Sequence, residues 1–149
     1  MERGVVFRLE DRLFALPLEV TARAVRAVEI TPLAIGLPGV PGVIDVHGEI
    51  MPVVDLRERF GLPPRALRPS AQFLLISSAR GPVALWVDAV DGVATWTEDD
   101  FVAAEPLFPG SRQLRGIARG ADGLVLVHDL DALLAPVDEA FAREAPGHD

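Results

Sequence analysis

Short segments rich in Val, Leu and Ile recur along this chain between Gly, Pro and Asp residues. Apolar runs this short, bounded by turn-forming residues, are typical of strands, because helices of soluble domains need longer periodic stretches. The pattern therefore predicts a mostly β fold. We expect strands at Val5–Leu9, Leu13–Leu18, Val40–Val46, Ile50–Leu56, Phe73–Ser77, Val83–Val87, Gly92–Trp96, Leu114–Arg119 and Leu124–His128.

The segment Gly42–Leu56 predicts a hairpin whose strands are joined at His47-Gly48-Glu49. A glycine in such a turn adopts a positive φ angle at little steric cost. Pro52 has no N–H to donate to a strand ladder, so it predicts an edge strand or a bulge at this place. Further hairpin turns are expected at residues 10–12 and 79–82, where polar residues and glycine separate apolar runs.

Few helices are expected. Residues 19–28 fit either a short helix or an irregular turn followed by a strand, because Val, Thr and Ala alternate there. Leu56–Phe60 is expected to form a single helical turn. Asp129–Leu134 predicts a short C-terminal helix, since acidic residues in a first turn are favoured by the helix dipole. Residues 137–144 extend this helix in one interpretation, and the tail 136–149 is expected to be partly flexible.

The chain contains a weak internal repeat. Ala15–Glu19 resembles Ala84–Asp88, and Gly48–Leu56 resembles Gly123–Leu130, with roughly 70 residues between the members of each pair. The repeat suggests two similar small barrels within one domain of residues 1–149, joined by a proline-rich connection. We place the subdomains at approximately 14–70 and 71–128, plus terminal segments. The alternative is that any valine-rich β chain shows such echoes.

Composition excludes several classes of protein. The chain has 149 residues, enough to bury a core of its own, and no cysteine, which excludes disulfides and thiolate metal sites. Its net charge of −8 argues against nucleic acid as a partner, since phosphates favour a basic surface. No apolar run is long enough to span a membrane and no secretion signal is evident, so a cytoplasmic protein is expected.

A search for chemistry returns little. No serine lies in a nucleophile elbow, and no phosphate-binding glycine motif is present. Asp45, His47 and Glu49 have a spacing that permits a metal site, but polar residues around a turn are usually only solvated. We therefore expect no catalytic residue, metal or cofactor, and favour a docking module that is not an enzyme.

Several motifs resemble the CheW family of chemotaxis coupling proteins. The resemblance extends from about Val5 to Leu134. It rests on Phe14-Ala15-Leu16-Pro17, Ile30-Thr31-Pro32-Leu33, Gly42–Leu56, Val87–Val93 and Leu126–Leu134.

The resemblance implies a mostly β fold of two packed, five-stranded SH3-like barrels with a short C-terminal helix. It also implies a non-catalytic adaptor that links the cytoplasmic tip of a methyl-accepting chemoreceptor to the regulatory domain of a chemotaxis histidine kinase. The receptor tip would lie near the groove between the barrels, and the kinase domain at a barrel end. Two alternatives are a small-ligand-binding β-barrel sensor and a hydrolase that uses His47 or His128.

The chain departs from the family pattern where the resemblance places a charge pair beside the receptor groove. The family acid is replaced by Arg23 and the family base by His47, so a different pair, Arg23 with Asp45, is expected. Exchanged charges at an interface alter partner choice, which suggests an adaptor with altered or single-partner binding. The alternative is that both residues are only solvated. The expected partner-binding residues are Thr21, Arg23, Gly42, Asp45, His47 and Val93.

Overall fold

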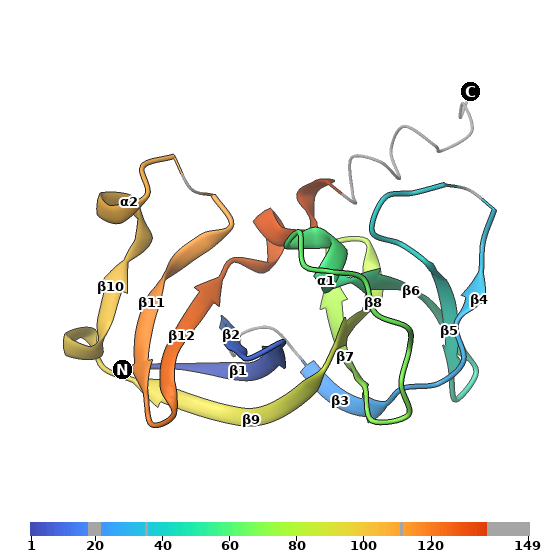
Figure 1. The fold of residues 1–149 in the computed structure, drawn as a ribbon, viewed down its shortest axis with the longest axis horizontal. Helices are drawn as coiled ribbons and strands as arrows, with labels where there is room; N and C mark the ends of the chain where they lie inside the picture. The colour runs from blue at the N-terminus through green and yellow to red at the C-terminus, as the bar shows by residue number, and fades with distance from the viewer. Residues whose placement is uncertain (18–21, 35, 111, 137–149) are drawn as a thin grey trace.

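The computed structural model describes residues 1–17, 22–34, 36–110 and 112–136, which form two six-stranded sheets side by side (Figure 1). The first sheet has the order β10 (Phe101–Ala103), β11 (Leu114–Gly120), β12 (Gly123–His128), β2 (Arg12–Pro17), β1 (Glu2–Leu9), β9 (Ala89–Trp96). The second has the order β3 (Ala22–Arg26), β7 (Gln72–Ser78), β8 (Gly81–Val87), β6 (Glu49–Asp55), β5 (Gly42–Val46), β4 (Thr31–Pro32). The short helices are α1 (Leu56–Arg59), η1 (Glu98–Asp100), α2 (Ala104–Leu107) and residues 130–136.

The predicted mostly β, SH3-like fold is confirmed, and each expected strand is present with shifted ends. Residues 22–26, left open between helix and strand, form β3. Each sheet has six strands where five were expected. The strands that no segment predicted include β4 and β10, which span two and three residues and are too short to show a periodic pattern. The extension of the last helix into residues 137–144 lies outside the described residues.

The strands assort differently from the expected subdomains 14–70 and 71–128. The second sheet takes its strands from residues 22–87, and the first combines residues 2–17 with residues 89–128. The reason is strand pairing: the β1–β2 hairpin joins β9 and β12, while the β7–β8 hairpin joins β3 and β6. The chain therefore crosses between the sheets twice, after β2 and again between β8 and β9, which runs along the first sheet (Figure 1).

The internal repeat corresponds to a repeated parallel pairing. In the first sheet β12 pairs with β2 so that Val127 lies opposite Ala15. In the second, β6 pairs with β8 so that Val53 lies opposite Ala84. The repeat aligns Ala15 with Ala84 and Val127 with Val53, so the two pairings join equivalent positions. The sequence repeat therefore has a structural basis.

Two of the repeated strands, β6 and β12, are each followed by a helix that an aspartate caps. Asp55 Oδ1 accepts a hydrogen bond from the backbone N–H of Arg57 at 3.0 Å, at the start of α1. Asp129 Oδ1 accepts one from the backbone N–H of Ala132 at 2.9 Å, at the start of the helical residues 130–136. A side-chain oxygen at this place satisfies an N–H that has no partner within the helix.

The β5–β6 hairpin has its turn at the predicted residues, and Gly48 adopts the predicted positive φ angle. His47 and Gly48 have φ angles of 51° and 89°, and Val46 pairs with Glu49 across them. The expectation that Pro52 marks an edge strand is wrong for the strand as a whole, because β6 lies between β5 and β8. The pairing with β8 begins only at Val53, so at Pro52 the strand is paired on one side, with Val43.

The sheets share one apolar cluster, and each has a smaller one of its own. The shared cluster joins side chains of β1 and β2 to side chains of β6, β7 and β8, with the last helix on top. Its buried members are Val5, Phe7, Leu9, Phe14, Leu16, Leu37, Val40, Val54, Leu56, Leu74, Ile76, Val83, Leu85, Val87, Leu130, Leu133 and Leu134. The sheets are therefore parts of one folded unit.

His128 is buried at the edge of the shared cluster, with 5% of its surface exposed. Its ring lies 5.5 Å from that of Phe14 and 5.0 Å from that of Phe60. Nδ1 lies 3.2 Å from the carbonyl oxygen of Leu126. Burial lowers the pKa of His128 below 6.5, and the nearby positive charge of Arg59 adds to this effect.

This burial predicts a protein that loses stability in mild acid. Below pH 6.5 His128 binds a proton in the unfolded chain but stays neutral in the folded chain. The free energy of unfolding therefore decreases as the pH is lowered from 6.5 to the pKa of His128 in the folded chain. A single such proton changes that free energy by at most about 1.4 kcal/mol per pH unit. We expect His128→Phe to reduce the difference in urea midpoint between pH 7.5 and 5.0. His47→Asn, at an exposed histidine, is the control. If both variants showed the same difference in urea midpoint between the two pH values, the loss of stability in acid would not come from His128.

Candidate functional site

The residues expected to bind a partner lie on both sheets. Gly42 and Asp45 lie on β5, and His47 lies in the turn that follows. Arg23 lies on β3, at the opposite end of the strand order of the same sheet. Val93 lies on β9 of the first sheet, with 59% of its surface exposed. Thr21 lies outside the described residues.

The expected ion pair between Arg23 and Asp45 is not formed between these two described residues. Asp45 Oδ1 instead accepts a hydrogen bond from the backbone N–H of Gly48 at 2.8 Å. The carboxylate therefore stabilises its own hairpin turn, as aspartate commonly does two or three residues before a tight turn. Arg23, Asp45 and His47 are all exposed, so each is accessible to a partner.

Gly42 has a steric role that is independent of any partner. It is buried on β5 and pairs with Pro32 of β4. A Cβ atom at this position would lie 2.0 Å from the carbonyl oxygen of Thr31, which is far inside van der Waals contact. Glycine is therefore required for β4 to lie against β5.

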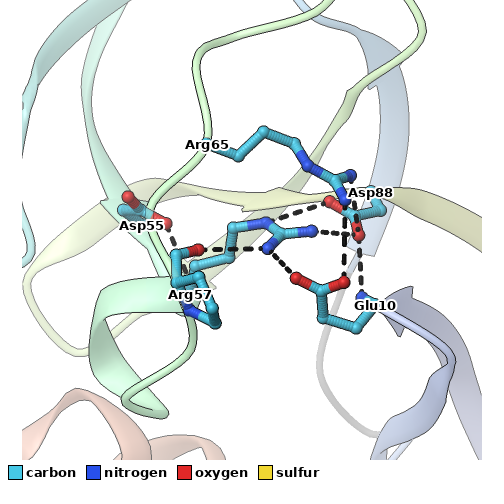
Figure 2. A network of polar contacts seen from close by, with 6 residues as sticks. Glu10, Asp55, Arg57, Arg65 and Asp88 are labelled. Atoms are coloured by element: carbon cyan, nitrogen blue, oxygen red, sulfur yellow. Dashed lines mark hydrogen bonds and ion pairs between the residues drawn. The ribbon is translucent and has the colours of Figure 1, made fainter.

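A charged cluster that the sequence analysis missed lies where the two sheets meet (Figure 2). At its centre is the guanidinium of Arg57 in α1, with 2% of the residue exposed. Its Nη2 donates to Asp88 Oδ2 at 2.6 Å and its Nε to Asp88 Oδ1 at 3.3 Å. Its Nη1 donates to Glu10 Oε1, which comes from the β1–β2 turn. The arginine thus binds two carboxylates from different parts of the fold.

Further contacts complete the cluster. Arg57 Nη1 donates to the carbonyl oxygen of Pro63 at 3.2 Å. Arg65 adds a second positive charge, 3.3 Å from Asp88 and 3.7 Å from Glu10. Asp88 Oδ2 also accepts the backbone N–H of Glu10 at 2.8 Å. Every group around the guanidinium is therefore a hydrogen-bond acceptor or a balancing charge, as a buried ion requires.

The pKa directions agree with this geometry. The hydrogen bond from Arg57 holds the pKa of Glu10 below 4.5. Burial alone would lower the pKa of Arg57, but its bonds to Glu10 and Asp88 outweigh this effect and raise it. Burial raises the pKa of Asp55, the residue that caps α1, above 3.8. Glu10 and Arg57 are thus both held in their charged forms across neutral pH.

This cluster is built to join segments. The fully paired charges leave no free acid, base or nucleophile at the guanidinium, so the geometry serves structure. In the part of the chain that the structure describes, no group of three metal-ligating side chains converges. No helix among the described residues is long and apolar enough to cross a membrane.

The cluster gives only a faint sequence signal. Arg57 directly follows an apolar strand and the buried Leu56, and Asp88 ends another apolar run. A charge at the end of a buried strand more often faces solvent, so the sequence does not distinguish these residues from surface ones. Their partner Glu10 is far from both along the chain and meets them only through the fold.

Comparison with known proteins shows extensive similarity. A family model described as CheW-like domain matches residues 3–137. The chain is 29% identical over 147 residues to a probable chemotaxis protein CheW of Rhizobium etli, covering 93% of this chain and 90% of that protein. It is 19% identical over 137 residues to the chemotaxis protein CheW of Treponema pallidum, covering 88% and 81%. The crystal structure of scaffolding protein TtCheW from Thermoanaerobacter tengcongensis matches with a TM-score of 0.76 and 27% identity, covering 89% and 92%.

Gly42→Ala is predicted to destabilise the fold even when no partner is present. The new Cβ would displace Thr31 and strain the β4–β5 pairing, and strain of this kind costs about 1–3 kcal/mol. Urea denaturation measures the loss. Gly120→Ala is the milder control, because its nearest contacts would be at 3.2 Å. Unchanged stability of Gly42→Ala would contradict the steric role of this glycine.

Arg57→Ala is predicted to cost about 3 kcal/mol of unfolding free energy, because it removes a buried guanidinium, and Arg65 only partly replaces its charge-assisted hydrogen bonds to Asp88 and Glu10. Asp91→Asn is the control. It breaks the ion pair of Asp91 with Arg8, which spans 2.9 Å and whose two side chains are 38% (Arg8) and 30% (Asp91) exposed. Exposed pairs contribute about 1 kcal/mol or less. Equal losses in the two variants, measured by urea denaturation, would refute the structural role of Arg57.

Proposed function

This chain belongs to the CheW-like domain family, and we propose that it is a non-catalytic adaptor of a chemosensory signalling array. The adaptor holds the cytoplasmic tip of a chemoreceptor and the regulatory domain of a histidine kinase in fixed geometry. The observation that carries this proposal is the match of the family model to residues 3–137, nearly the whole chain. The similarity to a scaffolding protein over 89% of the chain supports it.

The alternatives receive no comparable support. A small-ligand sensor needs a pocket with converging polar groups, whereas three apolar clusters fill the described interior. The two histidines considered for a hydrolase are in unlike places. His47 is exposed in a hairpin turn, and His128 is buried between aromatic rings.

We place the receptor-binding surface on Arg23, Gly42, Asp45, His47 and Val93, which come from both sheets or the turns between their strands, together with Thr21, which lies outside the described residues. Three of them, Arg23, Asp45 and His47, are exposed polar or charged side chains, and Val93 adds an exposed apolar contact. Gly42 contributes by shaping the β4–β5 edge. By the resemblance, Arg23 stands where the family has an acid and His47 where it has a base. These two changes alter the charge of the surface, and so determine which receptor is bound.

The test is binding of the purified chain to two separate proteins, a chemoreceptor cytoplasmic fragment and a kinase regulatory domain from its own organism. We expect the wild type to bind both. The double variant Arg23→Glu, His47→Arg should change the receptor affinity by roughly tenfold, or about 1.4 kcal/mol, and leave the kinase affinity unchanged. Calorimetry measures both affinities.

Arg12→Glu is the matched control, because Arg12 is an exposed arginine of the first sheet outside the proposed surface. A wild type that binds neither protein would overturn the adaptor function. A double variant that binds like the wild type would instead show that Arg23 and His47 are only solvated. Melting temperatures of all variants separate binding effects from unfolding.

A further inference from the structure

The proposed receptor surface requires a fixed relation between the two sheets. Val93 lies on β9 of the first sheet, whereas Asp45 and His47 lie on the β5–β6 hairpin of the second. A partner that contacts all three residues binds well only if the sheets keep one orientation. Ordering them at the moment of binding would lower the affinity.

The segments that determine this orientation meet at Arg57. Asp88 is the residue between β8 and β9, where the chain passes from the second sheet to the first. Its backbone N–H donates to the carbonyl oxygen of Arg8 at 3.0 Å, which holds the crossing against β1. Glu10 belongs to the β1–β2 turn of the first sheet, and Arg57 to the helix that follows β6 of the second. Figure 2 shows the guanidinium between the two carboxylates.

The shared apolar cluster also holds the sheets together, and its stabilisation depends on the apolar area that is buried and not on the direction of any contact. A guanidinium bound to two carboxylates is directional, because its N–H groups point along fixed lines in one plane. The charged cluster at Arg57 therefore adds a directional constraint on how the two sheets are oriented.

We propose that Arg57 is a positioning residue, whose bonds to Glu10 and Asp88 fix the orientation of the two sheets. This orientation aligns Val93 on the first sheet with Asp45 and His47 on the second, so that one receptor can contact all three. The alignment rests on the proposed function, whereas the orientation does not. The two parts are therefore tested by different measurements.

The orientation is measured by the distance between spin labels on the two sheets. The chain has no cysteine, so Ser77→Cys on β7 and Ala121→Cys in the β11–β12 turn provide unique and exposed attachment sites. The double variant Glu10→Gln, Asp88→Asn removes both negative charges with little change of shape, and Arg57→Met removes the guanidinium. Asp91→Asn is the control, since its ion pair with Arg8 lies within the first sheet.

We expect one narrow distance population in the wild type and in Asp91→Asn, and a broadened or displaced population in both cluster variants. Two cluster variants are used because Arg57→Met also removes a buried side chain and so lowers stability, whereas Glu10→Gln, Asp88→Asn keeps the shape of the cluster. Folded cluster variants that keep the narrow population would overturn the proposal and leave Arg57 with a stabilising role only.

Receptor binding by the unlabelled proteins then tests the alignment. We expect roughly tenfold weaker binding by the cluster variants, about 1.4 kcal/mol, and wild-type affinity for Asp91→Asn. A broadened population with unchanged receptor affinity would overturn the alignment. If the wild type itself binds no receptor fragment, the adaptor function fails, while the distance measurement still decides the orientation.

Discussion

The fold depends on the burial of apolar side chains between two sheets whose own apolar clusters are smaller than the one they share. Phe7 and Leu16 of the first sheet and Leu74 and Leu85 of the second belong to one cluster, covered by Leu133 of the last helix. Burying such side chains stabilises a fold by about 25 cal/mol per Å² of apolar surface. The shared cluster thus makes two similar halves into one unit and places their outer surfaces on a single body.

Burial explains why the sheets associate, and polar contacts explain how they are oriented. Arg57 is held by carboxylates from both sides of the junction, and Arg59 adds a hydrogen bond from its Nε to the carbonyl oxygen of Leu133 at 2.9 Å. Both arginines come from the single turn of α1, which Asp55 starts by capping. A short helix at the end of one strand thereby supplies two arginines to the junction. Further polar contacts there come from Asp88, whose N–H donates to the carbonyl oxygen of Arg8, and from Gln72, whose Oε1 accepts the N–H of Val90.

An adaptor works through the relative placement of its surfaces, so its function resides in rigidity and surface chemistry. The hairpin turn at His47 and Gly48, stabilised by Asp45, presents exposed side chains on one sheet, and Val93 presents an apolar one on the other. Arg23 and His47, which we propose to determine partner choice, are exposed, so substitutions there leave the core undisturbed.

The sequence alone determined the mostly β class, nearly all the strands, the short helices expected at Leu56–Phe60 and Asp129–Leu134 and the family, because apolar periodicity, turn residues and charges in a first helical turn are local signals. It also contained the repeat that equates β2 with β8 and β6 with β12. Only the tertiary structure decided which strands share a sheet, that Asp45 bonds to its own turn, and that Glu10, Arg57 and Asp88 meet. Those contacts join residues far apart along the chain, and the free energy that selects them comes from packing of the complete fold, which no local segment encodes.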